Sequence, residues 1–156
     1  MKFCPGLISV LALLALATGA AGIVVINEME VNPPDGGLEW VELYNSGNDT
    51  VDVSGWRISI EDGSWRGDIT MPPGTIIAPK EFAVGFGQRG WNHSGSGKAF
   101  LFDASGQKVD ETGSRSDYFD NDMTYGRYPD GRDTDKDGDW GLMMGSQGRP
   151  NQVGKS

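Results

Sequence analysis

The sequence predicts an all-β fold, a sandwich or barrel closed around one hydrophobic core. Short runs of alternating apolar and polar residues recur at intervals of roughly 8 to 12 residues, a spacing typical of such folds. The turns between the runs draw on 24 glycines and 8 prolines. No window carries apolar residues at sustained helical spacing, so neither a helical bundle nor an alternating α/β fold is indicated.

The stretch at residues 38–56 is the predicted centre of the fold. Val41 and Leu43 alternate with charged or polar neighbours, which is the period of a strand with one buried face. Residues 46–50 are dense in turn formers, so the chain is expected to reverse there. Trp56 follows a second bend, and a ring of that size contributes heavily to burial in a small domain. We therefore expect Trp56 to be buried in the core.

The first strand is expected at residues 23–32. Its alternation places Val25, Asn27 and Met29 on one face and Ile26 on the other. Beyond the central hairpin, further strands are expected in chain order, separated by turn formers such as Asp62-Gly63. These further strands are Val51–Val53, Trp56–Glu61, Asp68–Met71, Thr75–Ala78, Glu81–Phe86, Lys98–Phe102 and Gln107–Asp110.

The character of the chain changes from residue 113 onward. Aromatic residues are scattered among many aspartates there, and strand-like alternation is weak. The segment has too few aliphatic residues to form a core of its own. We expect residues 113–156 to be a loop-rich, acidic part of the same domain, packed over a sandwich formed by residues 23–112.

The first 22 residues predict an export signal. Lys2 precedes an almost unbroken apolar run, Leu7–Ala17, and small residues follow at positions 18–22. The run is shorter than the ~20 apolar residues of a membrane-spanning helix, so cleavage is favoured over anchorage. We expect a secreted or cell-surface protein with no transmembrane segment after cleavage. Cys4, the only cysteine, would leave with the leader, so neither a disulfide nor a thiolate site is expected.

The formal net charge of −9 bears on the partners. An acidic surface repels nucleic acid, so a nucleic-acid partner is not expected. The charge favours cations or basic surfaces, or it simply keeps an extracellular protein soluble. An unknown protein or another macromolecule at the cell surface is the expected partner, and the charge does not fix the oligomeric state.

Several motifs together resemble the lamin tail domain, including its prokaryotic secreted members. They are INE at residues 26–28, EWVELYNSG at 39–47, DVSGW at 52–56, PPGTIIAPKEFAV at 72–84, KAFLFDASGQKVDE at 98–111, and a late segment with TYGRYPDG at 124–131, DW at 139–140 and RPNQ at 149–152. The resemblance implies an immunoglobulin-like β-sandwich that serves as a non-catalytic binding or structural module for proteins or other macromolecules. Nuclear members contact protein and DNA, but the acidity of this chain argues against DNA.

An aspartate-rich loop is the strongest chemical signal. Carboxylates at alternate positions, with Gly138 among them, can wrap a Ca²⁺ ion, which takes roughly 6–8 oxygen ligands. The twelfth position of the loop is Met144 rather than glutamate, so it is not an EF-hand. A looser calcium site is one hypothesis, and a solvated acidic turn is the other. The predicted ligands are Asp133, Asp135, Asp137 and Asp139, with Asp130 as an extra candidate, and a second acidic group, Asp117, Asp120 and Asp122, either joins them or forms a charged loop.

A metal in this loop would allow an alternative function, a metal-dependent extracellular hydrolase or an accessory domain of one. Other catalytic groups are not indicated. His93 has no Ser-His-Asp arrangement that the spacing supports. The three glutamates near the start of the domain resemble a glycosidase pair only in type, since nothing in their spacing demands catalysis. We expect these residues, Glu28, Glu39 and Glu42, to bind backbone groups or the arginines Arg57, Arg66 and Arg127, and we expect no enzyme.

Two further features fall in predicted surface loops and turns. Asn48 and Asn92 begin triplets that match the N-glycosylation acceptor pattern in predicted loops. Trp65 and Trp91 are expected in turns, where a tryptophan either anchors a partner or folds back over the sandwich.

Overall fold

Eleven strands and two short 3-10 turns make up the described part of the chain, residues 24–87, 97–119 and 121–153 of a computed structural model. In chain order the strands are β1 (Val24–Glu30), β2 (Trp40–Asn45), β3 (Val51–Asp52), β4 (Arg57–Asp62), β5 (Trp65–Thr70), β6 (Ile76–Ile77), β7 (Phe82–Phe86), β8 (Gly97–Phe102), β9 (Lys108–Glu111), β10 (Met123–Arg127) and β11 (Trp140–Met144). The turns are η1 (Pro34–Gly36) and η2 (Asp137–Asp139).

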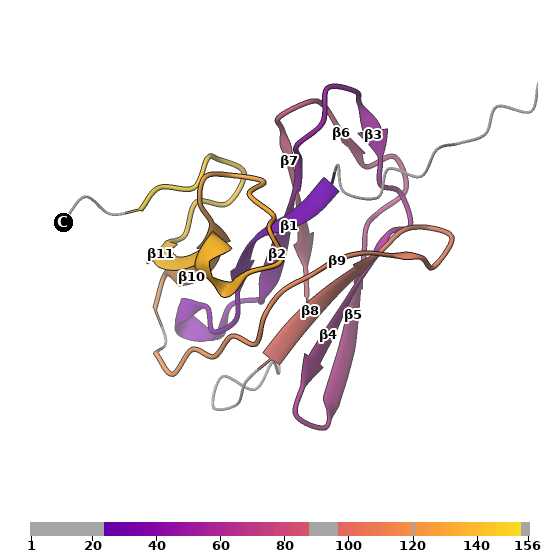
Figure 1. The fold of residues 1–156 in the computed structure, drawn as a ribbon. Helices are drawn as coiled ribbons and strands as arrows, with labels where there is room; N and C mark the ends of the chain where they lie inside the picture. The colour runs from indigo at the N-terminus through magenta and orange to yellow at the C-terminus, as the bar shows by residue number, and fades with distance from the viewer. Residues whose placement is uncertain (1–23, 88–96, 120, 154–156) are drawn as a thin grey trace, which may run out of the picture.

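The strands form two main antiparallel sheets. The larger has five strands in the order β11-β10-β1-β2-β7, and the smaller has four in the order β5-β4-β8-β9. Figure 1 shows β4, β5 and β8 on one side of β1 and β2 and the C-terminal strands on the other, while the pair β3-β6 lies at one end. The all-β, immunoglobulin-like sandwich predicted from the sequence is confirmed.

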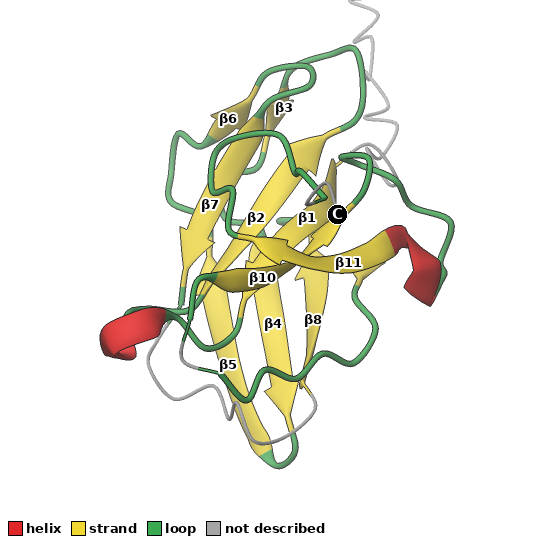
Figure 2. Cartoon of the chain, turned by 90° about the vertical axis from the view of Figure 1, so that its left-hand side faces the viewer, coloured by secondary structure: helices red, strands yellow, loops and turns green. Residues whose placement is uncertain are grey.

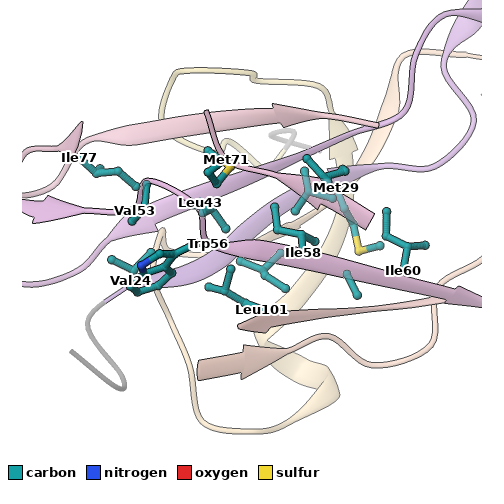
Figure 3. Close-up of a cluster of buried hydrophobic side chains, with 14 of the residues drawn as sticks. Val24, Met29, Leu43, Val53, Trp56, Ile58, Ile60, Met71, Ile77 and Leu101 are labelled. Atoms are coloured by element: carbon teal, nitrogen blue, oxygen red, sulfur yellow. The ribbon is translucent and has the colours of Figure 1, made fainter. Parts of the chain in front are cut away.

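The hydrophobic core lies between the two sheets (Figure 3). Trp56 lies immediately before β4 with 6% of its surface exposed, as predicted, and its backbone bonds to Val53 and Met71 hold it there. Side chains from both sheets meet in one cluster, which is how a sandwich closes. The cluster consists of Val24, Ile26, Met29, Val31, Val41, Leu43, Val53, Trp56, Ile58, Ile60, Ile69, Met71, Ile77, Ala99 and Leu101.

Strand β1 departs from the predicted alternation. Its pairing with β2 shifts register between Ile26 and Glu28, which is the signature of a β-bulge at Asn27. The extra residue turns the following side chains over, so Ile26 and Met29 both reach the core while Val25 does not. The predicted grouping of Val25, Asn27 and Met29 on one face is therefore wrong.

The β4–β5 hairpin is longer than the sequence predicted. Its turn contains Gly63 with φ of +58°, a left-handed conformation that glycine adopts without strain. Trp65 begins β5 rather than sitting in the turn, and its ring packs against the core cluster over Gly67. The structure thus favours a Trp65 that folds back over the sandwich.

The C-terminal segment contains two strands that its weak alternation did not predict. Strand β10 pairs antiparallel with β1, and β11 pairs with β10 across all five of its residues. In Figure 2 both strands cross in front of β4 and β8 at a steep angle. The segment that follows β11 lies on the outer face of β1 and β2, where the Ser146 and Gly148 N–H groups donate to Glu28 and Glu42.

Candidate functional site

The four aspartates of the predicted calcium loop point to different partners. Asp133 accepts a bond from Arg127 Nη1 at 2.9 Å. The Asp139 side chain is 1% exposed, and it accepts bonds from Arg132 Nε at 2.9 Å and from the Thr134 N–H at 2.7 Å. The loop is thus held from inside by an arginine and by its own backbone and hydroxyl donors.

The other two aspartates lie further out. Asp137 bonds to Arg115 Nη1 at 2.5 Å with its side chain 86% exposed, and Asp135 is exposed with a left-handed φ of +54°. Within the described ranges, no three acidic, histidine or cysteine side chains converge in a way that would hold a metal. The residues as placed do not form a coordination sphere, so calcium binding stays a prediction that requires the loop to rearrange.

The second acidic group does not extend this loop in the described residues. Asp117 is buried, and its carboxylate accepts the Phe119 N–H at 2.8 Å. Asp122 is exposed, and its carbonyl accepts the Gly145 N–H. Asp120 lies outside the described residues.

Arg127, at the end of β10, is the best-connected side chain beside the loop. It is 1% exposed, its Nε donates to the Ile26 carbonyl at 2.8 Å, and its Nη2 contacts both oxygens of Asp110 at 3.0 and 3.1 Å. Asp110 in turn accepts the Ile26 N–H at 2.7 Å. The pair therefore hydrogen-bonds both backbone groups of Ile26, next to the bulge in β1. It also joins β10 of one sheet to β9 of the other.

A small polar cleft lies above this ion pair. The guanidinium groups of Arg127 and Arg115 both lie over the Trp140 ring, at 4.8 and 5.3 Å from its centre. The cleft has a volume of about 180 Å³ and mixes cations with anions, so its lining selects no single charge. Its lining residues are Lys98, Glu111, Thr112, Gly113, Arg115, Arg127, Asp133, Asp135, Lys136, Asp137 and Trp140.

The predicted glutamates bind backbone and neutral side-chain donors. Glu28 accepts bonds from Thr124 Oγ1 at 2.6 Å, and Glu42 accepts one from Asn27 Nδ2 at 3.1 Å, besides the two N–H bonds from the C-terminal segment. Burial raises the pKa of Glu28 above its ordinary value and that of Glu42 to about 8, although these bonds oppose the rise. Glu39 is buried as well.

The three arginines proposed as partners pair with other residues than Glu28 and Glu42. Arg57 pairs with Asp68, and Arg66 pairs with Glu61. Arg127 pairs with the aspartates described above. For Glu28 and Glu42 the structure shows backbone bonding, which is one of the two expected alternatives.

Asn151 is a structural residue that the sequence did not single out. Its Nδ2 donates to the Arg127 carbonyl at 2.9 Å and to the Asn27 carbonyl at 3.2 Å, and its Oδ1 accepts the Ser146 hydroxyl at 2.7 Å. The residue is 4% exposed. It thus closes the C-terminal segment over the outer face of the sheet. Asn151 belongs to the RPNQ stretch at residues 149–152, to which the resemblance gave no role.

An apolar groove runs along β11, at the end of the five-stranded sheet. Its volume is about 730 Å³. Four of its lining residues each have between 44% and 62% of their surface exposed: Tyr128, Leu142, Met144 and Val153. Met123, Met143 and Gln152 complete the lining, which contains no charged residue. Exposed apolar surface of this kind is typical of interaction sites.

The other predicted positions lie either in an exposed loop or outside the described residues. Asn48 is exposed in the loop between β2 and β3, where its glycosylation stays a prediction. Trp91, Asn92 and His93 lie outside the described residues. No helix in the described part of the chain has the length and apolar character needed to cross a membrane.

The family model described as Lamin Tail Domain matches residues 17–116. This chain belongs to the lamin tail domain family. Lamin tail domains are immunoglobulin-like interaction or structural modules, and the family suggests that the chain is not an enzyme. No curated protein was found to match the chain. The lamin tail match ends before β10, so the two strands that complete the five-stranded sheet and carry the apolar groove lie beyond it.

Proposed function

We propose that this lamin tail domain is a non-catalytic module of the prokaryotic secreted type, exported to the cell surface or beyond, where it mediates protein or other macromolecular interactions. The observation that carries the proposal is the uncharged groove beside β11. Its exposed apolar side chains offer a large contact area, and a monomer with no partner there would leave that area in water at a cost.

The leader supports the extracellular part of the proposal. A positive start, an apolar run and small residues at positions 18–22 match a secretory signal, and the first strand begins at Val24, directly after it. The acidic surface is compatible with an extracellular module and unfavourable for nucleic acid.

A metal-dependent hydrolase or accessory domain is the alternative from the sequence. It would need the carboxylates of residues 133–139 to turn away from Arg127, Arg115 and Arg132 and to converge on one ion. The small polar cleft at this loop is the place where such an ion would be sought.

A binding comparison tests the proposal. The wild-type chain and the variant Leu142→Lys, each carrying the same affinity tag, are incubated with extracellular and envelope fractions of the source organism, and the retained proteins are compared. Ile76→Lys is the matched control, since Ile76 is 60% exposed on β6, outside the groove. We expect Leu142→Lys to lose retained species that Ile76→Lys keeps. Equal retention by all three chains would contradict a binding role for the groove.

A further inference from the structure

The backbone of β11 has one free side. The Tyr128 N–H on the β10 side donates to the Asp139 carbonyl, just before β11 begins. In an antiparallel pair the hydrogen-bonded positions alternate along each strand. Because Asp139 is bonded to the β10 side, the N–H and C=O groups of the odd-numbered residues of β11 point toward β10. The N–H and C=O groups of Leu142 and Met144 therefore point away from the sheet. No partner for them is found in the residues that the structure describes.

Side chains from both faces of β11 border this free side. Leu142 and Met144 occupy alternate positions and share one face, while Met143 lies on the other, and all three line the groove. Val153, from the segment that returns along the sheet, adds to the second side. The groove thus follows the strand edge, and it has the form that accepts another extended strand.

The edge lacks the devices that usually prevent such pairing. Proteins protect edge strands with lysines, prolines or bulges. Strand β11 reads WGLMM, carries no charge, and keeps a regular register with β10 over its whole length. The edges of the smaller sheet differ, because β5 carries Arg66 and Asp68 and β9 begins with Lys108. Strand β7, at the other end of the larger sheet, is uncharged but packs against β5 and β6.

We propose that the occupant of this edge is β11 of a second copy of the chain. The inference rests on the proposed function, because it takes the groove to be an interaction surface. The groove has no acidic or basic residue to pair with a charged segment, so it fits an uncharged apolar strand, and β11 is itself such a strand. Since the same patch appears on both sides, the contact closes as a two-fold dimer.

The backbone groups suit antiparallel pairing centred on Leu142. In such a pair, directly opposed residues exchange both of their N–H···O bonds, so Leu142 would bond to its own copy. The Met144 N–H would then face the Trp140 carbonyl of the other chain. The Trp140 N–H is already used on the Asp137 carbonyl, but its C=O points to the free side by the same alternation. The two five-stranded sheets would join into one continuous sheet.

Net charge sets how this dimer responds to salt. Two chains of charge −9 repel each other, while the strand contact itself is apolar. Salt at about 0.15 M reduces the screening length to about 8 Å, which weakens the repulsion between the acidic surfaces. We therefore expect the dimer to tighten as salt rises. A basic protein partner bound by charge would show the opposite dependence.

Sedimentation equilibrium of the purified chain over a wide concentration range tests the proposal. We expect reversible dimerisation that strengthens with salt, and at least a tenfold rise in the dimer dissociation constant for Leu142→Lys and for Met144→Lys. Ile76→Lys is the control and should dimerise like the wild type. Circular dichroism and thermal melting identify a variant that fails to fold, and the second lysine variant then decides.

Two outcomes would overturn the proposal: a wild-type chain that stays monomeric throughout, or lysine variants that fold and dimerise normally. A monomeric wild type that still loses bound proteins on Leu142→Lys would refute self-pairing and leave the proposed binding function intact. A monomeric wild type whose bound proteins are unaffected would refute both.

Discussion

Glu28 and Glu42 lie directly opposite each other on β1 and β2, and both side chains are fully buried. Neither has an arginine or lysine partner among the described residues. Their oxygens accept bonds from Ser146, Gly148 and Asn27 instead. Two buried carboxyl groups without a cation favour their neutral form, and burial is the main cause of the raised pKa of each.

This pair predicts that the domain loses stability as pH rises. A carboxyl group whose pKa is raised on folding binds more protons in the folded state than in the unfolded state. Its contribution to folding stability is therefore complete below the ordinary glutamate pKa of 4.5 and is lost as the pH rises through the folded-state pKa. Glu30, a third buried glutamate on β1, behaves in the same way. The pKa is about 8 for Glu42 and about 7 for Glu30, which places the loss between about pH 4.5 and about pH 8. We expect a decrease on the order of 2 to 4 kcal/mol, measured by urea unfolding at a series of pH values.

Glu42→Gln separates this effect from the general charge of the protein. Glutamine stays neutral, so the variant should lose stability with pH less steeply than the wild type. Glu81→Gln removes the same charge from an exposed position and should leave the slope unchanged. Equal slopes in all three proteins would show that Glu42 is not the group responsible.

The core gives a second prediction. Trp56 belongs to the buried cluster that also contains Leu43 and Leu101 (Figure 3), so Trp56→Ala should cost about 3–5 kcal/mol through lost burial and a cavity. Leu38→Ala is the comparison, because Leu38 is 45% exposed and its truncation should change stability by less than about 0.5 kcal/mol. Chemical unfolding of the two variants decides, and similar losses in both would contradict the role given to Trp56.

The sequence predicted the sandwich because its turns and alternating strands are local signals. The face of the sheet on which each β1 side chain lies was not predictable in the same way. The bulge at Asn27 depends on the pairing with β2 and on Asn151 and Gly131, which contact Asn27 from more than a hundred residues away along the chain. A single extra residue then reverses the alternation on which face assignments rest.

The apolar groove along β11 could not be predicted from the sequence, for a related reason. Strands β10 and β11 contain Gly126 and Gly141, which weaken a strand pattern, and they form because they pair with β1 and with each other. A Cβ on Gly126 would lie 2.6 Å from Asn151 Nδ2, so the close packing of the C-terminal segment requires glycine there. Only the folded sheet shows that β11 ends it and is exposed.

Export gives a third prediction. If residues 1–22 are a cleaved signal, the protein recovered from the culture medium of a secreting host should begin at or near Ile23. N-terminal sequencing and intact mass measure this directly. Replacing two leucines of the apolar run, Leu13 and Leu14, by arginine should abolish export. An uncleaved chain in the medium would contradict the assignment.

The calcium hypothesis gives a fourth prediction. A structural ion bound to residues 133–139 would raise the thermal midpoint in calcium relative to chelator, because a ligand of the folded state stabilises it. Asp133 and Asp139 already hold Arg127 and Arg132, so we expect equal midpoints in calcium and in chelator. Asp135→Asn changes an exposed carboxylate, and a shift that this variant removes would establish the site.

Arg127 and Asp110 give the last prediction, which concerns the closure of the sandwich. The pair is almost completely buried, and it joins the two sheets where β10 no longer covers the backbone of Ile26. Arg127→Met leaves Asp110 as a buried charge without a cation, so we expect a loss of about 3–5 kcal/mol in urea unfolding.

The double variant Arg127→Met with Asp110→Asn measures the coupling between the two residues. It removes the stranded charge, so it should be less destabilised than the sum of the two single variants by at least about 1 kcal/mol. Arg127→Lys should also lose stability, because one ammonium group cannot reach Asp110, Asp133 and the Ile26 carbonyl together. Additive losses would mean that Arg127 acts through its packing on Trp140 rather than through the ion pair.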